Sequence, residues 1–139
     1  DLVRETVKLL DEQNGKAYLA SDKDNCPADA FSIPYITNEQ SGLIIIENPS
    51  NKLEVGALQN ALDVMVKERK SADIDYIHGT KALESLSAET GNAGFALPAM
   101  DKFMLFPGVA ADGALPRKTF SMGEANEKRY YIESRYIGK

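Results

Sequence analysis

The stretch that decides the fold is residues 31–47, FSIPYITNEQSGLIIIE. Its first run alternates apolar side chains with Ser32 and Pro34, which is the period of a half-buried strand. Residues 37–42 are polar and contain a glycine, so they predict a turn, and the three consecutive isoleucines of residues 44–46 indicate a strand that is buried on both faces. We therefore expect a β-hairpin. Its first strand should lie at a sheet edge, because Pro34 has no N–H to donate.

A helix is expected on each side of this hairpin. Residues 53–69 place apolar side chains every three or four positions, and Asn51 with Glu54 resembles a capping box at the start of this helix. Residues 2–13 show the same period and end at Asn14-Gly15, a common C-terminal stop. A brief strand, residues 17–20, is expected between that helix and the hairpin.

The second half of the chain predicts shorter elements. We expect a strand over residues 74–79, a helix from Thr80 that ends by Gly91, and a strand over residues 94–98. A helical turn over residues 100–106 should be broken by Pro107-Gly108. Residues 130–137 predict a final strand, with Tyr130, Ile132 and Tyr136 on one face. Together these elements predict a single α+β domain over residues 1–139. Its sheet should be mixed or mainly antiparallel, with four to six strands packed by two to three helices.

Composition excludes several classes of protein. The chain has 139 residues, of which 43% are hydrophobic and 27% charged, as in globular domains. The net charge of −5 argues against a nucleic-acid partner, and no apolar run is long enough to suggest a membrane partner. With a single cysteine and a single histidine, neither a disulfide framework nor a histidine-rich metal site is possible, and we expect no metal site.

Two segments are candidate anion sites. The first is the predicted strand-to-helix junction His78-Gly79-Thr80, where the free N–H groups of a helix N-terminus could hold an anion. The alternative is an ordinary βα turn in which Gly79 permits the bend and Thr80 caps the helix.

The second candidate follows Pro116 and consists of Arg117, Lys118, Thr119 and Ser121. Adjacent cations and hydroxyls suit a phosphate or a carboxylate, and arginine can bind either one bidentately. Residues 117–139 hold six Lys/Arg against three Glu, a local charge of +3, while the remaining residues carry −8. The alternative is a solvated, charged loop that leads into the last strand.

Catalytic machinery is not evident in the sequence. His78 could serve as a base for Ser121 or Cys26, but the sequence gives no reason for these residues to be close together. We therefore expect no phosphatase, kinase or nuclease turnover from this chain alone, and no cofactor is indicated.

A family resemblance rests on three segments, residues 75–84 (DYIHGTKALE), residues 94–97 (GFAL) and residues 115–121 (LPRKTFS), followed by YYIE at residues 130–133. In this order they resemble the C-terminal part of the bacterial and archaeal family known as domain of unknown function 1015. That family has a strand–Gly–helix element, an apolar Gly-Phe-Ala-like strand and a terminal Pro-x-Lys-Ser/Thr-x-Phe segment. The resemblance covers roughly residues 42–139.

The resemblance implies that the chain is the C-terminal piece of a longer cytoplasmic protein. Full members carry a Gly-His-His-Arg type motif in their N-terminal half, which resembles ParB-like and free-serine-kinase-like domains. Two hypotheses follow. The chain is a structural or ligand-supporting domain with no activity of its own, or it completes a phosphotransfer or nucleotide site with a missing N-terminal half. Its partners would be that half and a small ligand bearing phosphate or carboxylate.

Overall fold

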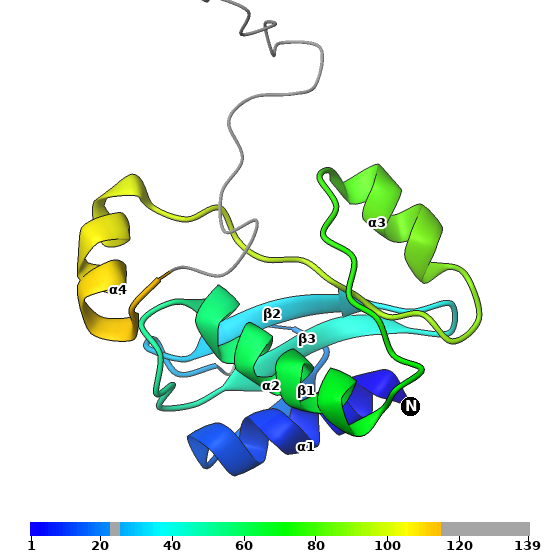
Figure 1. The fold of residues 1–139 in the computed structure, drawn as a ribbon, viewed down its shortest axis with the longest axis horizontal. Helices are drawn as coiled ribbons and strands as arrows, with labels where there is room; N and C mark the ends of the chain where they lie inside the picture. Colours follow the sequence, from blue (N-terminus) through cyan, green and yellow to red (C-terminus); the bar gives the residue numbers. More distant parts are fainter. Residues whose placement is uncertain (23–25, 115–139) are drawn as a thin grey trace, which may run out of the picture.

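The computed structural model of the chain describes residues 1–22 and 26–114. The predicted strand over residues 130–137 lies outside this part. Within it, an antiparallel sheet has the strand order β1-β3-β2-β4, and four α-helices accompany the sheet (Figure 1). The expected α+β class and single compact arrangement are confirmed.

The hairpin forms the centre of the sheet. β2 (Phe31–Ile36) pairs with β3 (Ser41–Ile46) over its whole length, from Phe31 opposite Ile46 to Ile36 opposite Ser41. The expected brief strand is present as β1 (Ala17–Ala20), which pairs with the other side of β3. All three isoleucines of β3 are fully buried, as their sequence predicts.

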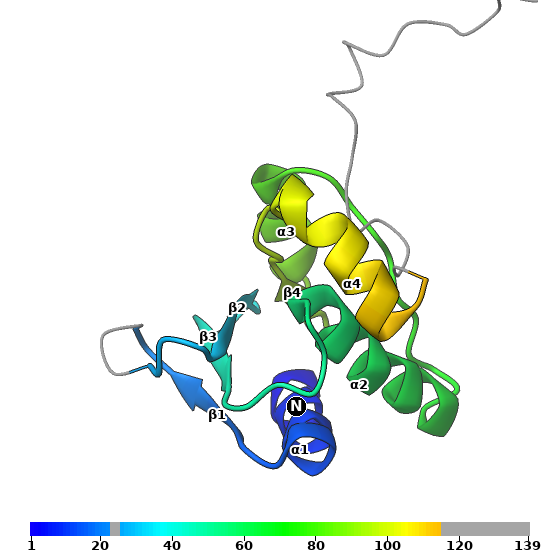
Figure 2. The ribbon, with the colours of Figure 1, turned by 90° about the vertical axis from the view of Figure 1, so that its left-hand side faces the viewer.

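Two helices cover one side of the sheet (Figure 2). They are α1 (Leu2–Asn14) and α2 (Glu54–Glu68), which match the expected helices to within a residue at each end. The apolar faces of both helices meet the inward side chains of β2 and β3. This core consists of Val3, Leu9, Leu10, Ile33, Tyr35, Ile44, Ile46, Ala57, Leu58, Ala61 and Met65.

The ends of the two helices are built differently. The Asp1 carboxylate accepts a hydrogen bond from the Val3 N–H at 3.0 Å and caps α1, and Gly15 ends α1 in the left-handed conformation with a φ of 86°. The prediction of a capping box at Asn51 is wrong. The N-cap of α2 is Leu53, in extended conformation and without a side-chain cap.

The first strand of the hairpin is not at the edge of the sheet, which corrects the expectation from Pro34. The short strand β4 (Gly94–Phe95) pairs with β2 through Tyr35 and Ile36, and the Ala96 N–H donates to the Pro34 carbonyl at 2.8 Å. The return bond would need an N–H on Pro34, which proline lacks. The proline therefore ends the β4 ladder, and the strand expected over residues 94–98 is only two residues long.

The prediction of a strand over residues 74–79 is also wrong. This segment has no regular structure and runs to the N-terminus of α3 (Thr80–Ser87). The carboxylates of Asp73 and Asp75 each accept a hydrogen bond from the next backbone N–H, at 2.9 and 2.8 Å. Such local bonds use the donors that a sheet ladder would need. The Tyr76 hydroxyl instead donates to Gln59 on α2 at 2.8 Å and holds the segment there.

Gly94 allows α3 to pack closely against β4. A Cβ atom at this position would lie 2.7 Å from Leu83 Cδ1 and even closer to Ser87 Oγ. Ser87 is the buried residue of α3, with 2% of its surface exposed. A glycine is therefore required where the helix crosses this strand.

The prediction that Pro107-Gly108 breaks the helical turn is wrong. A 3-10 turn, η1 (Lys102–Met104), continues directly into α4 (Leu105–Asp112), and Pro107 lies in the first turn of that helix. Proline is tolerated there because first-turn N–H groups have no partner within the helix. Gly108 is buried against Leu53, whose Cδ1 atom would lie 3.0 Å from an added Cβ, so α4 packs on the start of α2.

Candidate functional site

The turn between β2 and β3 is held rigidly by Thr37. Its hydroxyl donates to the Gln40 carbonyl at 3.0 Å and accepts from the backbone N–H groups of Glu39 and Gln40, at 3.3 and 3.1 Å. The Thr37 N–H also donates to the Gln40 carbonyl, at 2.8 Å. The exposed side chains of residues 38–40 are thereby presented on a fixed backbone.

A polar hollow of about 500 Å³ lies beside this turn, within the 300–1,000 Å³ range of small-molecule sites. Four segments bound it: the start of α1, the β2–β3 turn, the residues after α2, and the residues between α3 and β4. Its polar side chains are Asp1, Thr37, Asn38, Glu39, Gln40, Arg69, Ser71, Thr90 and Asn92. We call this space the turn hollow.

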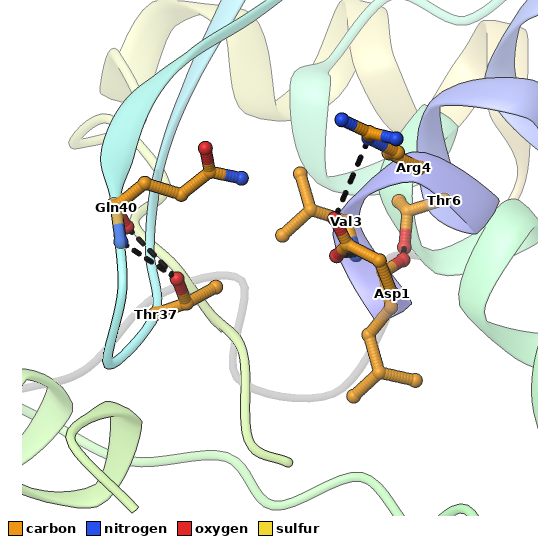
Figure 3. Close-up of polar contacts among 7 residues, drawn as sticks. Asp1, Val3, Arg4, Thr6, Thr37 and Gln40 are labelled. Carbon is orange, nitrogen blue, oxygen red and sulfur yellow. Dashed lines mark hydrogen bonds and ion pairs between the residues drawn. The ribbon is translucent and has the colours of Figure 1, made fainter. Parts of the chain in front are cut away.

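Figure 3 shows polar contacts on two sides of the turn hollow, at the hairpin turn and at the first turn of α1. Thr37 and Gln40 lie on the hairpin, and the Gln40 side chain extends from it toward the first turn of α1. On the opposite side, Asp1 caps the helix and lies 3.6 Å from the Arg4 guanidinium. Within the described part of the chain, Gln40 forms hydrogen bonds only through its backbone, so its carboxamide can meet a ligand.

The charges around the turn hollow do not favour an anion. Arg69, which lines the turn hollow, makes a two-pronged ion pair with Glu5, with Nε–Oε1 at 3.0 Å and a second nitrogen–oxygen contact of 2.5 Å. A guanidinium bound in this way has less capacity for a second carboxylate or phosphate. The carboxylates of Asp1 and Glu39 also face this space, and they would repel a negative ligand.

A smaller hollow of about 290 Å³ lies at the start of α2, whereas the turn hollow lies beyond its end. Its wall is mainly apolar, and its charged side chains are Lys52, Glu54 and Asp101. The apolar side chains in the wall are Phe31, Leu53, Val55, Leu97, Pro98, Ala99, Met100 and Met104.

A polar cluster joins the ends of β1 and β3. The Glu47 carboxylate accepts from the Lys16 ammonium at 2.7 Å and from the Tyr18 hydroxyl at 3.1 Å. The hydrogen bond from Lys16 holds the pKa of Glu47 below its usual value, and the same bond raises the pKa of Lys16. Burial of the ring, followed by the bond to Glu47, raises the pKa of Tyr18. This cluster closes the end of the sheet, and neither hollow includes it.

The structure describes only part of the predicted anion site. His78, Gly79 and Thr80 are exposed, and Gly79 is the N-cap of α3 with a φ of 96°. Thr80 is the first residue of α3 and does not cap it, and α3 has no side-chain cap. None of the three residues lines either hollow. The other predicted residues, Arg117, Lys118, Thr119 and Ser121, lie outside the described part of the chain.

Sequence reasoning interpreted residues 37–42 as a turn and did not identify the turn hollow. Its wall comes from segments up to about ninety residues apart, and no local motif marks such a set. The Lys16–Glu47 pair was also missed, although a signal existed. Lys16 precedes the strand at residues 17–20 and Glu47 follows residues 41–46, so antiparallel pairing of these strands places opposite charges across from each other.

Comparisons with protein-family models, with curated proteins and with solved structures give no match to this chain.

Across residues 1–22 and 26–114, no three His, Cys, Asp or Glu residues are grouped as a metal site would require. No helix in that part is both long and apolar enough to span a membrane.

Proposed function

We propose that this chain is a ligand-supporting domain with no catalytic activity of its own, and that the turn hollow receives a small, uncharged, hydrogen-bonding molecule. The observation that carries this proposal is the turn hollow itself. Hydroxyl and carboxamide side chains from separate segments meet there, beside a backbone turn fixed by Thr37.

The chemistry of the wall favours a polyhydroxylated compound. Hydroxyls and amides both donate and accept hydrogen bonds, so they can match the mixed donors and acceptors of a polyol or sugar. The two carboxylates accept from ligand hydroxyls, and they disfavour phosphate. As expected from the family resemblance, the domain would work within a longer cytoplasmic bacterial protein, with an N-terminal half as its partner.

The test is titration of the full chain with a panel of neutral monosaccharides and polyols, followed by amide chemical shifts. We expect concentration-dependent shifts confined to residues 37–40 and 90–93, with millimolar affinity that weakens at least severalfold in Gln40→Ala. That variant keeps the turn, because only the backbone of Gln40 holds it. Gln13→Ala removes an exposed amide elsewhere and should bind like the natural chain. Shifts scattered over the surface, or unaltered by Gln40→Ala, would contradict the proposal.

A second candidate function is a contribution to a phosphotransfer or nucleotide site. The N-terminus of α3, which has no side-chain cap, supports it, since its first N–H groups lie next to the exposed His78 and to Gly79, whose φ is 96°. Inorganic phosphate in the same titration tests this candidate. Shifts of residues 78–82 and 117–121 together, without shifts of residues 37–40, would favour it over the turn hollow.

A further inference from the structure

Exposed apolar side chains gather on one surface of the second half of the chain. Of the seven large hydrophobic side chains that are exposed in residues 1–22 and 26–114, five lie between residues 97 and 109. They are Leu97, Phe103, Met104, Phe106 and Val109. Phe106 is the most exposed of the seven, at 81%, and Phe103 follows at 75%. Exposed apolar clusters of this kind are typical of surfaces that contact another protein.

This surface combines a hollow with projecting rings. The smaller hollow at the start of α2, which we call the apolar hollow, has Met104 in its wall. Phe103 directly precedes Met104, and Phe106 lies three residues further along the same side of η1 and α4. Another side of α4 packs on Leu53 through Gly108, so α4 holds the exposed rings beside the hollow (Figures 1 and 2).

We propose that this surface pairs with the same surface of a second copy of the chain, and that Phe106 of each copy enters the apolar hollow of the other. A two-fold symmetric dimer uses one surface of both copies, so that surface must contain both a projection and the cavity that receives it. Here the two lie next to each other, with Phe106 on α4 and the apolar hollow between η1 and the start of α2.

The apolar hollow has the size and the chemistry to hold a phenyl ring. An apolar cavity of about 150 Å³ is enough to bind benzene, and the apolar hollow measures about 290 Å³. Phe31, Met100 and Met104 in its wall suit an aromatic ring, since ring–ring and sulfur–ring contacts are both favourable. Phe103 is less suited to insertion, because the Lys102 ammonium already lies 5.2 Å from the centre of its ring.

The charged groups around the apolar hollow allow two copies to meet. Lys52, Glu54 and Asp101 line it, and Lys102 follows Asp101, so two positive and two negative side chains lie in or next to its wall. A surface of one sign would repel its own copy. Because the two signs are balanced here, each copy can place its lysines opposite the carboxylates of the other.

The exposed apolar area is sufficient for a weak dimer. Phe103 and Phe106 are both at least three-quarters exposed, and since a phenylalanine can bury 150 Å² or more, they offer about 300 Å² in each copy. The wall of the apolar hollow and the other three exposed side chains bring a pair of copies toward the area of about 1,200 Å² at which specific interfaces begin. We therefore expect a Kd on the order of 100 µM.

Sedimentation equilibrium of the full chain tests the proposal. We expect a monomer–dimer equilibrium that Phe106→Ser weakens at least about tenfold. Ala99→Arg, which fills the apolar hollow from an exposed position in its wall, should weaken the equilibrium to a similar extent. Leu86→Ser is the matched control. It removes an apolar side chain that is 41% exposed on α3, outside this surface, and should leave the Kd unchanged.

A mixture of the two weakened variants distinguishes insertion of Phe106 from nonspecific apolar association. Phe106→Ser retains an open hollow, and Ala99→Arg retains the projecting ring, so a heterodimer restores one of the two contacts of the natural dimer. We expect the mixture to associate at least about threefold more strongly than either variant alone.

Several outcomes would overturn the proposal. The chain could stay monomeric up to about 500 µM, well above the expected Kd, or Phe106→Ser could leave the Kd unchanged. A mixture that associates no more than its components would show that Phe106 does not enter the hollow. A monomer that Phe106→Ser destabilises more than Leu86→Ser would identify another part of the same chain as the occupant. The proposal is independent of the turn hollow, because it involves different residues and requires no added ligand.

Discussion

Glu47 shows how one side chain can link two strands that are distant in sequence. Its carboxylate bonds both Lys16 and Tyr18, and its own N–H donates to the Lys16 carbonyl at 2.9 Å. The side chain is 17% exposed, whereas that of Lys16 is 60% exposed. The pair is thus partly open to water, and its contribution depends on the protonation of Glu47.

The lowered pKa of Glu47 predicts a pH dependence of stability. A carboxyl whose pKa is lower in the folded state stabilises the fold above its unfolded pKa, about 4.3 for glutamate, and this stabilisation is lost as the pH falls through the folded value. We expect the Tm of the natural chain to fall more steeply below about pH 5 than that of Glu47→Gln. Thermal unfolding followed by circular dichroism measures this. Glu89→Gln, an exposed control, should follow the natural chain.

The close packing around Gly94 predicts a second effect of a single residue on stability. In Gly94→Ala the new methyl group would clash with Leu83 and Ser87, so α3 must shift away from β4. Overpacking of this kind costs about 1–3 kcal/mol in the free energy of unfolding, measured by urea denaturation. Gly56→Ala is the matched control. It lies in the first turn of α2, where the atoms nearest to the added Cβ belong to the movable Asn51 side chain, so we expect little change or a gain in stability. Equal effects at both positions would contradict this account.

At the scale of elements, the sheet depends on the helices α1 and α2 that cover one of its faces. Ile44 is fully buried between β1 and β2 and belongs to the core shared with both helices. Ile44→Ala should lower the free energy of unfolding by about 2–5 kcal/mol, the usual cost of a large-to-small core substitution. Leu86→Ala, at a 41% exposed position, should cost about 0.5 kcal/mol or less. Chemical denaturation of both variants measures the difference.

The same elements show what the sequence could predict. Long periodic segments, such as residues 2–13 and 53–69, became α1 and α2 because their apolar faces match the sheet they cover. The wrong predictions concern short segments, in which one hydrogen bond determines whether a strand forms or how long it is. The missing N–H of Pro34 shortened β4, and the carboxylates of Asp73 and Asp75 took donors that a strand at residues 74–79 needed. The turn hollow was beyond sequence reasoning, because only the tertiary fold brings its walls together.

At the scale of the whole molecule, the described chain is unevenly packed. Residues 1–68 supply nearly all of the buried apolar side chains, through α1, the three longer strands and α2. Residues 69–114 contribute little to this core and leave Leu86, Leu97, Phe103 and Phe106 exposed. The domain thus joins a well-packed first half to a second half whose apolar surface is available for contacts with other segments.

The central place of the hairpin has a consequence for the order in which the protein folds. β2 and β3 are joined by only four residues, so their pairing closes a short loop and requires little chain entropy before the other strands can add. We expect this pair to be formed in the folding transition state, whereas α3 docks later. In stopped-flow experiments Thr37→Ala should then mainly slow refolding, and Leu83→Ala should mainly accelerate unfolding. A reversed pattern would show that the chain begins to fold from its second half.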